Sequence, residues 1–121
     1  MSTLKIPTSF QLYGQTINVV WKDTLSHDDD SCGQSHFRRN EIWMQKASIQ
    51  YPKKDEQLQQ TFCHEFVHYL LYFANYTAEV EGALHANEPL VERIAFLLQQ
   101  ALSTMEYEEV KIINPDVMIM R

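Results

Sequence analysis

The sequence predicts an α+β fold, in which a small antiparallel sheet in the N-terminal half packs on a buried helix and on a second, C-terminal helix. Three observations predict this class. Residues 9–45 alternate apolar and polar side chains between turn-forming residues, residues 57–74 contain neither Gly nor Pro, and residues 90–105 carry apolar side chains at helical spacing. The length of 121 residues and the 45% content of hydrophobic residues predict a single domain, residues 1–121, with its own core.

Two hairpins are predicted for the sheet. Residues 9–21 alternate apolar and polar side chains around Gly14, a pattern that is typical of a β-hairpin or a bent strand. Residues 33–37 and 41–45 flank the turn-forming sequence Arg38-Arg39-Asn40, which predicts a second hairpin whose later strand leads toward the first helix.

The two helices have recognisable starts. Asp55 and Glu56 complement the N-terminus of a helix that continues to Ala74. Glu88-Pro89 opens the second helix, which runs to about Met105, because Pro suits the first helical turn. The first helix is expected to be mostly buried, since its apolar residues cover more than one stripe: Leu58, Phe62, Phe66, Val67, Tyr69, Leu70 and Phe73.

Composition excludes several partners. The formal net charge of -6, from 10 Lys plus Arg and 16 Asp plus Glu, repels phosphate backbones, so we expect no nucleic-acid partner. No apolar run approaches the roughly 20 residues that span a bilayer, and residues 1–7 lack the apolar segment of a signal peptide. We therefore expect no membrane association, a cytoplasmic location, and free thiols at Cys32 and Cys63.

Two further stretches have simple interpretations. Residues 27–30, a histidine followed by three aspartates, predict a solvated loop rather than a second cation site, because consecutive residues do not converge on one ion without a special loop. The apolar tail 110–120 is expected to dock as an edge strand or to bind a partner.

The central motif of the chain is His64-Glu65-Phe66-Val67-His68. Two histidines four residues apart on a helix lie on one face with Cβ atoms about 5–6 Å apart, so both imidazoles reach one cation. The carboxylate of Glu65 is then placed to take a proton from metal-bound water. The alternative is an apolar core helix with two hydrogen-bonded histidines. A metal better explains ionisable groups in a buried helix, because it offsets their desolvation.

A catalytic zinc ion takes three protein ligands, so a third ligand is expected downstream. Glu88 is favoured because it begins the second helix, and Glu92 lies one turn later on the same face. If the helices pack side by side, Glu88 reaches the metal and Glu92 accepts the imidazole N–H of a ligand histidine. The sequence thus predicts one Zn²⁺ per chain, held by His64, His68 and Glu88. The other candidates for the third position are Glu79, Glu81, His85 and Glu92.

The motif at 64–68 followed by Asn87-Glu88-x-x-x-Glu92 resembles the gluzincin class of zinc metallopeptidases. The small size and the order of elements also resemble short phage- and mobile-element-associated proteins related to the ImmA/IrrE metallopeptidases. The resemblance covers roughly residues 40–105 and implies a minimal zincin-like domain. It also implies that His64, His68 and Glu88 bind zinc and that Glu65 is the general base. In longer ImmA/IrrE relatives the ligand glutamate lies closer to the position of Glu92. The resemblance therefore leaves both Glu88 and Glu92 as candidates for the third zinc ligand.

These features predict a zinc-dependent metallopeptidase that acts on a peptide or protein substrate. Glu65 takes a proton from zinc-bound water and passes it to the leaving amine. The strand at 42–45 is expected to bind an extended substrate at a sheet edge. By resemblance, the substrate is a regulatory protein of a phage or mobile element. Candidate donors to the developing oxyanion are Tyr72, Tyr76 and His85.

Two other functions use the same residues. A non-catalytic zinc-binding or protein-interaction module with the same fold would follow if His85 completed a closed set of four ligands. A metal hydrolase acting on a non-peptide amide would keep the same ligands and base, and would differ only in its pocket.

Overall fold

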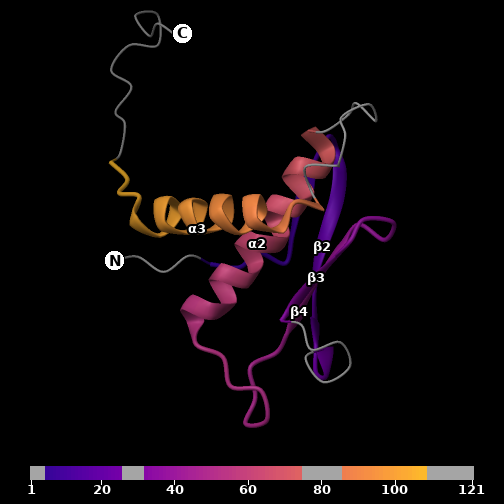
Figure 1. Cartoon of the computed structure of the whole chain (residues 1–121), viewed down its shortest axis with the longest axis vertical. Coiled ribbons are helices and arrows are strands. Elements are labelled where there is room, and N and C mark those ends of the chain that lie inside the picture. Colours follow the sequence, from indigo (N-terminus) through magenta and orange to yellow (C-terminus); the bar gives the residue numbers. More distant parts are fainter. Residues whose placement is uncertain (1–4, 26–31, 75–85, 109–121) are drawn as a thin grey trace, which may run out of the picture.

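The computed structural model of the chain describes residues 5–25, 32–74 and 86–108, and contains a four-stranded sheet and two long helices (Figure 1). This arrangement confirms the predicted α+β class. The loop at 27–30 and the tail at 110–120 lie outside the described residues. The elements in chain order are β1 (Ser9–Leu12), β2 (Gln15–Lys22), β3 (Gly33–His36), β4 (Glu41–Gln45), α2 (Asp55–Ala74) and α3 (Glu88–Thr104).

Both predicted hairpins are present. β1 and β2 pair antiparallel, and the turn between them has positive φ angles at Tyr13 (49°) and Gly14 (74°), as the tight turns of hairpins require. β3 and β4 also pair antiparallel, with Asn40 (φ 53°) in the connecting turn. Asn tolerates this left-handed conformation better than other non-glycine residues.

The sheet is mixed, whereas an antiparallel sheet was expected. β2 pairs parallel with β4, so the strand order is β1-β2-β4-β3. Turn chemistry and alternation act within each hairpin, but the pairing of one hairpin with the other joins residues more than twenty positions apart. That pairing depends on how both hairpins pack on α2, which local patterns do not encode.

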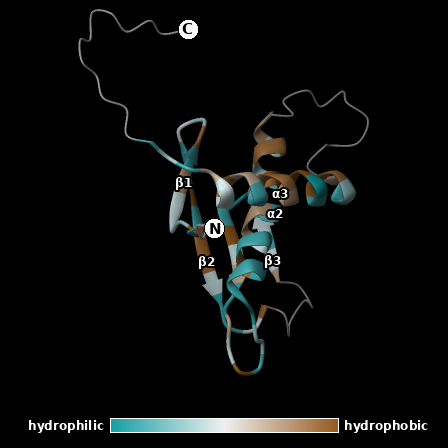
Figure 2. Ribbon diagram, turned by 90° about the vertical axis from the view of Figure 1, so that its left-hand side faces the viewer, coloured by the Kyte–Doolittle hydropathy of each residue, from teal (hydrophilic) through white to brown (hydrophobic). Residues whose placement is uncertain are grey.

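The core lies between one face of the sheet and α2. Ile17, Ile42 and Met44 are fully buried on this face, and the alternation along β2 is visible as teal and brown bands in Figure 2. α2 packs against β3 and β4 and also against α3, which crosses it in Figure 1. The middle of α2 is buried or partly buried from position 59 to 71, whereas both ends of the helix include exposed residues, so the burial expected for the helix is limited to its middle.

The start of α3 is defined by its cap. The side chain of Asn87 accepts a hydrogen bond from the main-chain N of Leu90 at 3.2 Å, and Pro89 occupies the first turn. Val91 and Ala95 of α3 are fully buried. The cap and these two buried residues fix the position of the first turn of α3, and with it the position of Glu88. In the described part of the chain, no helix has the length and hydrophobicity needed to cross a bilayer.

Tyr69 joins α2 to the second hairpin. Its side chain is fully buried, and its hydroxyl lies 2.8 Å from the carbonyl oxygen of His36 and 3.0 Å from that of Glu41. Burial raises the pKa of Tyr69 to about 12, so the hydroxyl remains a donor.

We expect Tyr69→Phe to lower the free energy of unfolding by about 1–3 kcal/mol, because two part-buried carbonyl oxygens lose the hydrogen bonds donated by the Tyr69 hydroxyl. Urea denaturation measures this change. The control is Tyr13→Phe, a residue that is 78% exposed, for which the change should stay within about 0.5 kcal/mol. Equal stability of the two variants would contradict this role of Tyr69.

Candidate metal centre

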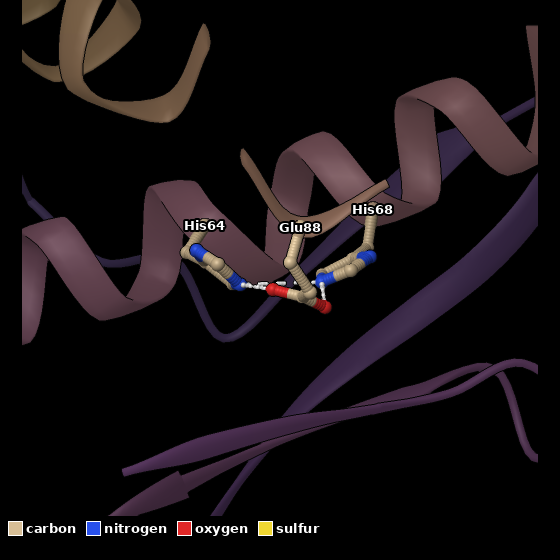
Figure 3. Close-up of side chains that lie close together, drawn as sticks. All are labelled: His64, His68 and Glu88. Carbon is tan, nitrogen blue, oxygen red and sulfur yellow. Dashed lines mark hydrogen bonds and ion pairs between the residues drawn. The ribbon is translucent and has the colours of Figure 1, made fainter. Parts of the chain in front are cut away.

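Three side chains from two helices converge at one point of the structure. His64 and His68 lie one turn apart on α2, and Figure 3 shows the carboxylate of Glu88, the first residue of α3, between their imidazoles. The two Nε2 atoms are 3.2 Å apart. Glu88 Oε2 lies 2.9 Å from His64 Nε2, and Glu88 Oε1 lies 3.0 Å from His68 Nε2.

These distances fit a shared zinc ion. Ligand atoms bound tetrahedrally at about 2.0–2.1 Å are separated by about 3.3 Å, close to the spacing of the three side chains. Two imidazoles and one carboxylate are also a donor set found at catalytic zinc sites, where the fourth position is left for water. The side chains of His64 and His68 are 19% and 11% exposed, whereas that of Glu88 is 62% exposed, so the site is accessible from the side of Glu88.

The protonation of His64 is compatible with this assignment. Its Nδ1 lies 2.6 Å from Glu92 Oε2, a carboxylate oxygen that can only accept, so we place a proton on Nδ1. With that proton on Nδ1, the Nε2 atom faces Glu88 and His68. These contacts are satisfied either by a second proton on the ring, given to Glu88, or by a metal cation among the three side chains. The three side chains are therefore close enough together to hold a metal ion.

Glu92 lies on the opposite side of the His64 ring from Glu88. Besides accepting from His64, it accepts at Oε1 a hydrogen bond of 3.2 Å from the side-chain amide of Gln60. A carboxylate that holds the second nitrogen of a ligand histidine selects its tautomer and orients the ring. The structure thus brings Glu88 to the ligand cluster and places Glu92 as the hydrogen-bond partner of His64.

Glu65 is almost fully buried, with 6% of its surface exposed, and it contacts β3. Ser35 Oγ donates a hydrogen bond of 2.8 Å to Glu65 Oε1. Burial raises the pKa of the Glu65 carboxyl above its ordinary value, while the Ser35 hydrogen bond and the nearby histidines act in the opposite direction. A carboxylate in such surroundings is suited to exchange protons.

A cleft of about 550 Å³ opens over this cluster. It is bounded by β3 and the residue after it, by the motif residues of α2, and by the start of α3. β3 is the last strand of the sheet, and no further strand pairs with it in residues 5–25, 32–74 and 86–108. The cleft therefore runs beside a sheet edge. Its lining residues are Gly33, Gln34, Ser35, His36, Phe37, His64, Glu65, His68, Ala86 and Glu88.

This arrangement corrects one expectation from the sequence. The strand at 42–45 was expected to offer a free edge to a substrate, but β4 pairs with β2 on one side and with β3 on the other. Its main-chain donors and acceptors are used within the sheet. β3 lies outside β4 and is an edge strand of the described sheet.

Of the three expected oxyanion donors, Tyr72 alone lies in the described residues, and it is not brought to the cleft. The ring of Tyr72 stacks on Phe37 with centroids 4.2 Å apart, and Tyr72 does not line the cleft. Tyr76 and His85, like the remaining ligand candidates Glu79 and Glu81, lie outside the described residues.

Sequence reasoning missed three residues of the site: Gly33, Ser35 and Gln60. Gly33 carried a usable signal, because glycine inside a strand often marks a close approach of another segment. Ser35 and Gln60 are common polar residues whose spacing to the motif has no regular pattern, so nothing in the sequence indicated them.

Residues 7–88 match the SprT-like family. This stretch contains the whole sheet, α2 and the three clustered side chains, and it ends at Glu88. No curated protein and no solved structure matches the chain. The relation to the ImmA/IrrE metallopeptidases stays a prediction. Because the match covers more than half of the 121 residues, the chain belongs to the SprT-like family, which is part of a zinc metallopeptidase-like superfamily.

Proposed function

We propose that this chain is a zinc-dependent metallopeptidase, in which His64, His68 and Glu88 hold one Zn²⁺ and Glu65 is the general base. The observation that carries the proposal is the convergence of three lone-pair atoms within 4.8 Å of one another. A buried carboxylate lies beside them in an open cleft. Membership of a metallopeptidase-like superfamily supports the same reaction class.

The residues of the chain have separate tasks in this reaction. When bound, the zinc ion lowers the pKa of a coordinated water and polarises the carbonyl group that is attacked. Glu65 accepts the proton of the attacking water and delivers it to the leaving amine nitrogen. Glu92 keeps the His64 ring in the orientation that presents Nε2 to the ligand cluster.

A peptide is the substrate that best fits the cleft. An extended peptide can add to a sheet by main-chain hydrogen bonds with an edge strand, and β3 is an edge strand of the described sheet, beside the clustered side chains. We extend the proposal to a regulatory protein of a phage or mobile element as the natural substrate. That step rests only on the resemblance of the sequence to the ImmA/IrrE-related proteins.

The test combines metal content with hydrolysis. Purified protein should carry near one zinc ion per chain by mass spectrometry. It should also cleave members of a quenched fluorescent peptide library, lose this activity on chelation and regain it when zinc is returned. His68→Ala should lose the metal, whereas His36→Ala, a histidine of the cleft outside the cluster, should retain it.

Three results would contradict the proposal in whole or in part. A protein that takes up no zinc when zinc is supplied would leave the histidines as core residues. One zinc ion per chain without cleavage of any peptide would instead support a non-catalytic zinc-binding module. Cleavage of non-peptide amides only would retain the zinc site and change the substrate class.

A further inference from the structure

Strand β3 lies against the side chain of Glu65 and hydrogen-bonds one of its carboxylate oxygens. Ser35 Oγ lies 2.8 Å from Oε1 and 3.2 Å from the main-chain oxygen of the same glutamate. A Cβ atom added to Gly33 would lie 3.3 Å from Oε2 and 3.2 Å from Cγ. Side chains alternate between the two faces of a strand, so positions 33 and 35, two residues apart, lie on the same face, which is the face toward α2. The carboxylate is thus bounded by two positions of one strand.

The close approach of β3 to α2 depends on Gly33. A Cβ atom at this position would lie 2.7 Å from Cγ2 of Thr61, closer than carbon atoms approach without displacement. The absence of a side chain therefore lets the strand come near enough for the Ser35 hydroxyl to reach Glu65. Gly33 permits the short distance between β3 and α2, and Ser35 makes the hydrogen bond to Glu65 across it.

We infer that Ser35 is a positioning residue that holds the Glu65 carboxylate in place for proton transfer, an inference that rests on the proposed function. A glutamate side chain has three rotatable bonds, and a general base is effective only when it is oriented toward its proton before the reaction. Ser35 and Glu65 line the same cleft, and the hydrogen bond to Oε1 restricts rotation of the carboxylate.

The first test separates turnover from binding. Ser35→Ala is expected to lower kcat about 10- to 100-fold, as removal of an orienting partner does. KM should change by less than about threefold, because no substrate contact is removed. Zinc content should stay at one per chain. Ser35→Thr retains the hydroxyl and should recover most of the lost rate. Ser9→Ala, which removes an exposed hydroxyl from β1, should leave both constants unchanged.

The second test asks whether Ser35 acts through Glu65. In a Glu65→Gln background the base is absent, so adding Ser35→Ala should cause no further loss of the residual rate. A further tenfold loss would show that the hydroxyl contacts the substrate or the reacting atoms itself. That result would overturn the positioning role.

The third test requires no activity. In urea unfolding of the metal-free protein, Ser35→Ala should lower the folding equilibrium constant about tenfold when Glu65 is present, and clearly less in a Glu65→Ala background. If the Ser35 and Glu65 substitutions had additive effects on stability and the wild type were an active peptidase, only the inference on Ser35 would be overturned. An inactive wild type would overturn the proposed function itself.

Discussion

Glu65→Gln is expected to lower the rate of peptide hydrolysis by about 10²- to 10⁴-fold, the usual contribution of a positioned general base. An amide of the same shape cannot accept the proton of the attacking water. It can still accept the hydrogen bond of Ser35, so the buried side chain keeps its place. Because Glu65 is not one of the clustered ligands, zinc should remain at one ion per chain.

The measurement is kcat of the zinc-loaded variant on a peptide found with the wild type, together with its metal content. The matched control is Glu56→Gln, an exposed acid in the first turn of the same helix, which should retain the wild-type rate. If Glu65→Gln bound zinc and hydrolysed the peptide at the wild-type rate, Glu65 would not be the base.

Glu88→Ala and Glu92→Ala are expected to differ in their effect on zinc. Glu88 supplies both oxygens that face the two Nε2 atoms, so its removal takes away one of three ligands and should leave the purified protein without zinc. Within the described residues, Glu92 hydrogen-bonds Nδ1 of His64 and the side-chain amide of Gln60, and it is not one of the clustered ligands. Its loss should lower zinc affinity about 10- to 100-fold, as for other residues that orient a ligand histidine.

Competition with a chromophoric chelator measures both affinities, and Glu56→Ala serves as the control for the loss of an exposed acid. The opposite order would exchange the roles of the two glutamates. Zinc would then be lost with Glu92→Ala and kept with Glu88→Ala, which is the alternative that the spacing of the motifs left open.

Local patterns were sufficient to predict every described element that forms the site. The turn at Gly14, the alternation in residues 33–45 and the uninterrupted run ending at Ala74 each depend on interactions within a few residues. The pairing of His64 with His68 is equally local, because four residues of α-helix place two side chains on one face. The choice of Glu88 required one further assumption, that the second helix packs against the first, and α3 does pack against α2, which it crosses at an angle.

The sequence by itself therefore determined the hairpins, the two helices and the pair of histidines that face one point. Only the tertiary structure decided that β2 pairs parallel with β4, that β3 forms the sheet edge at the cleft, and that Ser35 meets Glu65. The physical reason is separation along the chain. Ser35 and Glu65 are thirty residues apart, and their contact depends on a strand approaching a helix at Gly33, a distance set by the packing of the whole core.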